Sequence, residues 1–237
     1  MTEKPLVYDL GMNQGRNLPY YLAKGCRVVA VEAAPNLVSA ARERFRDAIV
    51  AGDLIVLNVG VAAADGVGEF YLNSEDTVHS SFVKPAAWGP EWSVVEIPTR
   101  PVSKLIEEYG APWFLKIDVE GYDGVVLREL MTAGVRPPSM SAEAHSIDVI
   151  CALIALGYDE FQLINGRDIG TSISRREITT VDGRKVPYLF PRHAAGPFGD
   201  DLPGPWLSAE AAMYQWLGRR AFFGRGWIDV HARESIA

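Results

Sequence analysis

Short runs of apolar and β-branched residues alternate along most of the chain with segments of helical periodicity. Each run is bounded by glycine, proline or polar residues, which is typical of buried parallel strands joined by helices. The predicted strands are Leu6–Leu10, Arg27–Glu32, Leu54–Ala62, Val94–Thr99, Trp113–Gly121, Ser139–His145 and Asp159–Ile164. The predicted helices are Asn13–Lys24, Pro35–Asp47, Val102–Tyr109, Asp123–Ala133 and Ile147–Leu156. This alternation predicts an α/β fold with a doubly wound, mostly parallel sheet.

The segment 165–225 fits this pattern less well. It contains "PYLFPRHAAGPFGDDLPGPW", which is dense in proline, glycine and aromatic residues. We expect an ordered insertion over the active-site edge, with one helix at Ser208–Arg219. Gly226–Ala232 would then return as a final antiparallel strand, with His231 half-exposed on it. The prediction is one domain over residues 1–237, with a Rossmann-like, seven-stranded sheet and an insertion in its C-terminal half.

Composition narrows the class of protein. Of the 237 residues, 48% are hydrophobic and 22% charged, which is typical of a globular chain, and the net charge of −7 argues against nucleic-acid binding. Cys26 and Cys151 each lie in an apolar run and are predicted to be buried free thiols in a reducing compartment. No leader-like segment opens the chain, and no apolar run nears the roughly 20 residues that span a bilayer. We therefore expect a cytoplasmic protein with no membrane partner; a homodimer is left open.

The loop after the first strand contains the pattern D-x-G-x-N-x-G, formed by Asp9, Gly11, Asn13 and Gly15. A dinucleotide fingerprint would need glycine where Asn13 and Arg16 stand, and no phosphate-binding G-K-[ST] follows. An NAD-dependent oxidoreductase is thereby disfavoured.

The pattern resembles the first motif of class I S-adenosylmethionine-dependent methyltransferases, with Asn13 at the usual second glycine. Glycine would let the loop approach the donor closely, and Asp9 could complement the donor ammonium directly or through water. Glu32 ends the second strand and could accept both ribose hydroxyls; the alternative is an ordinary turn with a surface glutamate. Asn58 could face the adenine or make a strand-end hydrogen bond. The predicted donor-binding set is Asp9, Gly11, Asn13, Gly15, Glu32, Ala33, Asn58, Val61 and Asp118.

A second resemblance lies further along the chain. "FLKIDVEGYDGVVLREL", with the K-I-D-V-E-G segment at Lys116–Gly121, is similar to the FkbM-type methyltransferase family. "HSSF" at His79–Phe82 and "AEAH" at Ala142–His145 resemble two further segments of that family. The likeness spans Leu6–Ile164. It implies methyl transfer from S-adenosylmethionine, usually to an oxygen of a sugar or secondary metabolite. A non-catalytic nucleoside-binding module is the rival class.

Three candidate catalytic groups follow the fourth and fifth core strands. Asp118 ends one strand, while Glu143 and His145 are two positions apart and share one side of the next. His145 is the first candidate for general base, because imidazole exchanges protons near neutral pH, with a helix-capping role as the alternative. The same three residues could instead hold Mg²⁺ or Mn²⁺ and polarise an acceptor hydroxyl.

Four residues are candidates for contacts with a small-molecule acceptor. Ser80 and Ser81 could bind it through their hydroxyls or be ordinary turn residues. Glu120 could contact substrate or cofactor, or cap a helix. Trp206 belongs to an aromatic-rich part of the insertion that suits a sugar ring or flat metabolite, or that forms a small satellite core.

Overall fold

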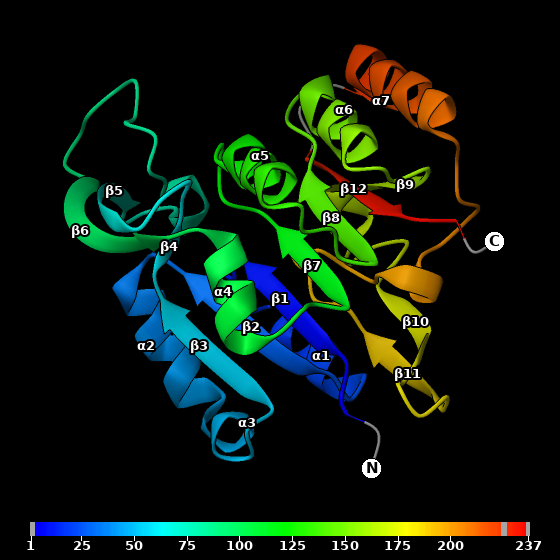
Figure 1. Cartoon of the computed structure of the whole chain (residues 1–237), viewed down its shortest axis with the longest axis horizontal. Coiled ribbons are helices and arrows are strands. Elements are labelled where there is room, and N and C mark those ends of the chain that lie inside the picture. Colours follow the sequence, from blue (N-terminus) through cyan, green and yellow to red (C-terminus); the bar gives the residue numbers. More distant parts are fainter. Residues whose placement is uncertain (1–2, 224–226, 236–237) are drawn as a thin grey trace.

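A seven-stranded sheet forms the centre of the computed structural model, which describes residues 3–223 and 227–235 (Figure 1). The strand order is β3-β2-β1-β7-β8-β12-β9, and β12 runs antiparallel to both of its neighbours. The strands are β1 (Leu6–Leu10), β2 (Arg27–Glu32), β3 (Leu54–Asn58), β7 (Phe114–Ile117), β8 (Ser139–Glu143), β9 (Glu160–Asn165) and β12 (Ile228–Arg233). The predicted doubly wound, mostly parallel sheet with an antiparallel last strand is confirmed.

Helices cover both faces of this sheet (Figure 1). Alternate residues of β1 enter opposite cores: Leu6, Tyr8 and Leu10 face one, and Val7 faces the other. The first face carries α4 (Val102–Tyr109), α5 (Asp123–Ala133), α6 (Ile147–Ala155) and α7 (Ala209–Phe223), and the second carries α1 (Leu18–Ala23), α2 (Pro35–Arg44) and α3 (Arg46–Val50). No helix of the described residues is long and apolar enough to cross a membrane.

Several element boundaries differ from the prediction. The first helix begins only at Leu18, where a proline occupies its first turn, so residues 11–17 form a non-helical loop. The predicted strand Leu54–Ala62 divides into β3 and the short β4 (Gly60–Val61). Strand β4 leaves the main sheet and joins a small sheet with β6 (Trp92–Arg100) and β5 (Gly66–Asn73). The loop between β5 and β6 contributes residues to the cavity described below.

The segment after β9 is an ordered insertion, but most of it packs against α1 (Figure 1). It contains an unpredicted strand pair, β10 (Arg175–Thr179) with β11 (Lys185–Leu189). Lys24 at the end of α1 forms a buried ion pair of 2.6 Å with Asp201, which also accepts a hydrogen bond from the Tyr20 hydroxyl. The insertion is therefore anchored to the N-terminal part of the fold.

Two burial predictions were wrong. Cys151 is exposed, because α6 turns that position toward solvent, whereas Cys26 is buried as expected. His231 is buried rather than half-exposed, because β12 lies between β8 and β9 in the sheet instead of at its edge.

Candidate active site

A cavity of about 580 Å³ opens at the carboxyl ends of β1, β2, β7 and β8. This is the edge where ligands bind in open α/β sheets. Nine predicted site residues line it: Gly11, Asn13, Glu32, Ala33, Val61, Ser80, Asp118, Glu120 and Glu143. Six predicted residues do not: Asp9, Gly15, Asn58, Ser81, His145 and Trp206.

The loop after β1 is shaped by contacts within the chain. Gly11 has φ of +77°, and a Cβ atom there would lie 1.8 Å from the carbonyl oxygen of Asp118. Glycine is therefore required where the loop crosses the β7–α5 connection, and Gly11 also lines the cavity. Asn13 adopts a left-handed φ of +49°, a conformation that asparagine tolerates. This explains how asparagine can replace the usual second glycine of the motif.

Glu32 is fixed at the end of β2. Its two carboxylate oxygens accept hydrogen bonds from the backbone N–H groups of Asn13 and Ala34, both at 2.8 Å. Burial raises the pKa of Glu32, and these N–H groups oppose that shift. The Asn58 amide donates to the carbonyls of Glu32 and Ala33, so Asn58 makes the strand-end hydrogen bonds and does not line the cavity. Glu32 thus presents a rigid acceptor to the cavity.

A buried lysine connects the first and fourth core strands. Lys116 Nζ lies 3.1 Å from Asp9 Oδ1 and 3.1 Å from Asp118 Oδ2. Burial opposes the ammonium, but the two carboxylates outweigh it and hold the pKa of Lys116 above its usual value. Asp9 is fully buried against Lys116, so the predicted direct contact with a donor ammonium does not fit its position. The sequence feature that indicates these ion pairs is a lysine inside an otherwise apolar strand, β7.

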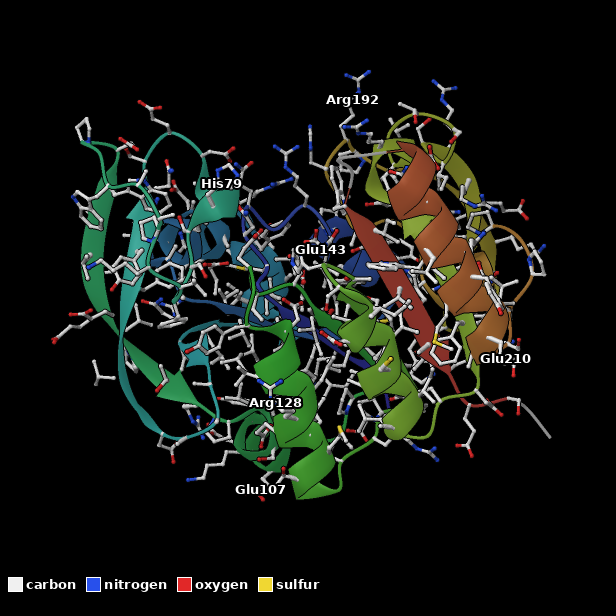
Figure 2. The ribbon with its side chains drawn as sticks, turned by 90° about the horizontal axis from the view of Figure 1, so that it is seen from above. His79, Glu107, Arg128, Glu143, Arg192 and Glu210 are labelled. Atoms are coloured by element: carbon white, nitrogen blue, oxygen red, sulfur yellow. The ribbon has the colours of Figure 1, made fainter. Side chains whose placement is uncertain are left out.

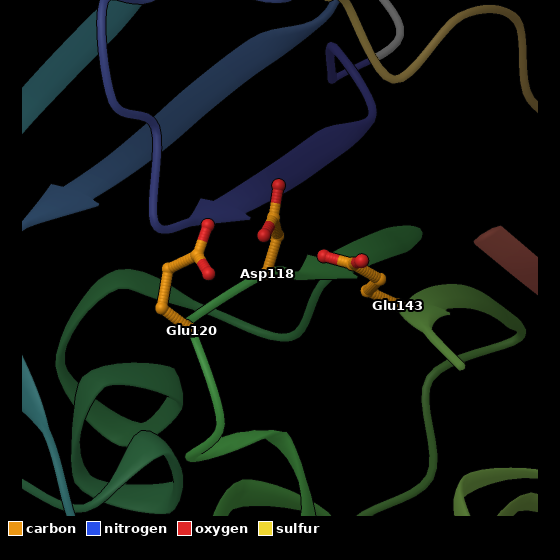
Figure 3. Close-up of side chains that lie close together, drawn as sticks. All are labelled: Asp118, Glu120 and Glu143. Carbon is orange, nitrogen blue, oxygen red and sulfur yellow. The ribbon is translucent and has the colours of Figure 1, made fainter. Parts of the chain in front are cut away.

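Three carboxylates converge where β7 and β8 end (Figure 3), and one of them is Asp118, the partner of this lysine. Asp118, Glu120 and Glu143 each offer an oxygen atom, and these atoms all lie within 4.8 Å of one another. Burial, followed by the neighbouring Asp118, raises the pKa of Glu120 to about 8 and that of Glu143 to about 9. Glu120 has φ of +47°, a strained conformation for a non-glycine residue. Such strain at a cavity is typical of a functional position.

The hydroxyls of Ser80 and Ser81 have structural partners. Ser81 donates a 2.7 Å hydrogen bond to the carbonyl of Glu120 and so supports its strained backbone. Ser80 accepts from the N–H of Asn73 at 3.0 Å, although it also lines the cavity. These contacts are those expected if Ser80 and Ser81 are ordinary turn residues, which was the alternative to acceptor binding.

Two of the six predicted residues that do not line the cavity, His145 and Trp206, have other partners. His145 Nε2 is 3.4 Å from a Glu143 oxygen and 4.0 Å from Asp123 Oδ2, so it stands behind the cavity-lining carboxylate. It does not cap α6; Ser146 does, by accepting from the N–H of Asp148. Trp206 lies under the Arg233 guanidinium, 4.0 Å from the ring centre, at the amino end of β9. That is the opposite edge of the sheet, so the predicted acceptor contact of Trp206 was wrong.

Asp229 was not predicted. Its strand β12 pairs it with Glu143, it is buried, and it lines the cavity. Burial and Asp118 raise its pKa to about 8, and its Oδ2 atom has no hydrogen-bond partner among the described residues. An acidic residue inside the apolar run "GWIDVHA" was the only sequence signal.

The fold and this cavity define a class of protein. The acidic lining formed by Glu32, Asp118, Glu120, Glu143 and Asp229 suits a sulfonium donor with an ammonium group better than the pyrophosphate of a dinucleotide, because positive charge favours the ionised forms of these groups and negative charge opposes them. Glu32 at the end of β2 is placed to accept ribose hydroxyls. Together with the loop after β1, these features define an S-adenosylmethionine-dependent methyltransferase.

Comparison with protein families gives the particular family. The chain matches the Methyltransferase FkbM domain over residues 9–151, more than half of its length, and belongs to that family. This confirms the resemblance seen in the K-I-D-V-E-G segment. A search of curated proteins finds no match.

Solved structures with the same kind of fold are distant in sequence. The precorrin-6y C5,15-methyltransferase from Geobacter metallireducens is 9% identical, covers 99% of this chain and 82% of its own, and has a TM-score of 0.42. The precorrin 8w decarboxylase from Methanobacterium thermoautotrophicum is 12% identical, with 98% and 83% covered and a TM-score of 0.43. Neither likeness carries an argument about the reaction of this chain.

Proposed function

We propose that this methyltransferase acts on a hydroxyl oxygen of a sugar or another small metabolite. The observation that carries the proposal is the convergence of Asp118, Glu120 and Glu143 at the ends of β7 and β8. A hydroxyl is a poor nucleophile at neutral pH, so an acceptor of this kind needs groups that orient it and remove its proton. The three carboxylates can supply both functions: they can orient the hydroxyl and accept its proton.

An aromatic platform beside the carboxylates supports a ring-shaped acceptor. The indole of Trp227 lies so close to Gly166 that a Cβ there would be 1.7 Å from the ring. His193 stacks on Trp227, with ring centres 5.9 Å apart and planes at 22°. Both side chains line the cavity, as does Asp229. A sugar ring could rest on this platform while its hydroxyls donate hydrogen bonds to the carboxylates.

The proposed step is an in-line displacement. S-adenosylmethionine supplies the methyl group, whose carbon forms a bond to the acceptor oxygen while the carbon–sulfur bond breaks and its electron pair stays on sulfur. Glu143 takes the hydroxyl proton and can pass it to His145, whose Nε2 is 3.4 Å away. Positive charge in the cavity favours the ionised form of Glu143, which burial otherwise disfavours. Asp118 orients the acceptor from the neighbouring strand end.

Calorimetry with S-adenosylhomocysteine, followed by turnover assays with glycosides and with amines, tests this proposal. We expect saturable binding of S-adenosylhomocysteine and a product that mass spectrometry identifies as methylated on oxygen. Absence of binding would contradict methyl transfer. Methylation of amines alone would contradict the hydroxyl acceptor, and binding without turnover of any acceptor would favour a non-catalytic module.

A further inference from the structure

The carboxylate cluster has a geometry that suits one small cation. The oxygens of Asp118, Glu120 and Glu143 lie within 4.8 Å of one another (Figure 3). Mg²⁺ holds oxygen ligands at about 2.0–2.1 Å, so two ligands on opposite sides of this ion are about 4 Å apart. The three oxygens can therefore share a single ion after side-chain movements of less than about 1 Å.

Among the described residues, the basic groups paired with this cluster are Lys116 and, when it is protonated, His145, whose Nε2 lies 3.4 Å from Glu143. Lys116 Nζ lies 3.1 Å from Asp118, but it lies equally close to the fully buried Asp9 and is shared between them. Like charges confined in one site repel one another strongly when water is excluded. The cluster thus needs a further cation for all of its members to remain ionised.

Asp229 provides an independent observation. Only 6% of this residue is exposed, it lines the same cavity, and its Cα pairs with that of Glu143 across β12 and β8. Its Oδ2 atom is buried with no hydrogen-bond partner among the described residues. A buried carboxylate oxygen without a donor is costly when the group is ionised, and a positively charged group bound here would remove that cost.

We infer that Asp118, Glu120 and Glu143 hold one hard divalent cation, of the Mg²⁺ or Mn²⁺ class, with Asp229 beside it. The ligand set contains only oxygen atoms, which these ions prefer over the nitrogen and sulfur ligands chosen by Zn²⁺. From the sequence, His145 was the candidate for the third ligand. We replace it with Glu120, because Glu120 lines the cavity and His145 does not. The left-handed backbone of Glu120, supported by Ser81, directs this third carboxylate to the cluster.

The inference rests on the proposed function and specifies its acceptor. A cation held by one oxygen of each carboxylate can polarise an acceptor hydroxyl through one of its open positions, which leaves the second oxygen of Glu143 to take the hydroxyl proton. Such an ion favours acceptors with two neighbouring oxygens, as in a vicinal diol, because both can replace water on it. The acceptor class is therefore a diol-bearing ring and not an isolated alcohol.

Binding of Mn²⁺ to the full chain without donor tests the site directly. Electron paramagnetic resonance of free Mn²⁺ should show one ion bound per chain, and Mg²⁺ should displace it. Glu120→Gln and Glu143→Gln should each weaken Mn²⁺ binding by about 10- to 100-fold. Glu107→Gln, an exposed carboxylate of α4 at the periphery, should leave it unchanged (Figure 2).

Three other results of this experiment would contradict the proposed cation site. No Mn²⁺ binding by the wild-type chain, or equal binding by Glu120→Gln and Glu143→Gln, would overturn it; the wild-type measurement does not depend on how the variants fold. Stoichiometric displacement of Mn²⁺ by S-adenosylhomocysteine would show that the carboxylates contact the donor instead. If S-adenosylhomocysteine binds and Mn²⁺ does not, only this inference fails; if S-adenosylhomocysteine does not bind, the proposed function fails.

Discussion

The imidazole of His145 lies directly behind Glu143, with Nε2 3.4 Å from a carboxylate oxygen, and only Glu143 of the two lines the cavity. Asp123 Oδ2 stands 4.0 Å from the same nitrogen. His145 therefore connects a cavity-lining carboxylate with a buried one. In the proposed mechanism His145 is therefore a positioning and proton-relay residue, and Glu143 makes the contact with the acceptor.

Replacing His145 by glutamine should slow turnover without affecting donor binding. Glutamine keeps a polar group next to Glu143 but cannot carry the proton away, so we expect kcat to fall by about 10- to 100-fold. The dissociation constant of S-adenosylhomocysteine should change by less than about twofold, because His145 does not line the cavity. Initial rates and calorimetry on the same preparations measure both. An unchanged kcat in His145→Gln would remove His145 from the mechanism.

Glu32→Gln should weaken donor binding. The carboxylate holds the N–H groups of Asn13 and Ala34 with one oxygen each, and an amide can accept only one of these bonds. Loss of a charged acceptor from this buried position costs about 1.5–3 kcal/mol, so the affinity for S-adenosylhomocysteine should fall by about 10- to 100-fold. Calorimetry measures the change, and the exposed Glu210→Gln on α7 serves as control (Figure 2). Equal affinities in the two variants would show that Glu32 does not support the donor site.

Gly11→Ala should destabilise the fold far more than another glycine substitution at a similar backbone angle. At Gly11 (φ +77°) the new Cβ would lie 1.8 Å from the Asp118 carbonyl oxygen, whereas at Gly183 (φ +82°) nothing lies within 4 Å. Gly183→Ala should cost about 1–2 kcal/mol, the price of the left-handed conformation alone. Gly11→Ala should cost roughly 3 kcal/mol or more, because the loop must also move. Urea unfolding of both variants measures the difference, and similar losses would contradict the close crossing.

The sequence predicted the fold well wherever one local pattern determined one element. Buried apolar runs located β1, β2, β7 and β8, and the polar residues that follow them gave Glu32, Asp118 and Glu143 at the cavity. The pair β10 and β11 escaped prediction because its strands are mostly exposed and carry mixed polar residues.

The cavity residues that we did not predict from the sequence depend on strand order and on the insertion. Asp229 reaches Glu143 only because β12 inserts between β8 and β9, and Trp227 and His193 meet only through the insertion. No local spacing encodes these relationships. His145 shows the converse case: its spacing from Glu143 suggested a shared strand face, but β8 ends at Glu143 and the chain turns there.

His231 makes the stability of the chain sensitive to acid. Its ring is buried in β12, 6.4 Å from the ring of Phe114 between centroids, and neither ring nitrogen has a hydrogen-bond partner among the described residues. Burial lowers its pKa to about 3. Because the unfolded chain binds this proton near pH 6.5 and the folded chain does not, the stability is complete above that pH and declines as the pH falls toward 3.

His231→Phe should remove this part of the acid sensitivity. Between pH 7 and pH 5 the wild-type chain should lose about 2 kcal/mol more of its unfolding free energy than the variant does. Glu143, Glu120 and Asp229, whose pKa values are raised to about 9, 8 and 8, contribute with the opposite sign, because the folded state binds their protons more tightly. Those contributions are common to both proteins and cancel in the comparison. Urea unfolding at the two pH values measures the difference, with the exposed His79→Phe as control. Equal losses in His231→Phe and the wild type would show that His231 takes up its proton in the folded state as readily as in the unfolded one.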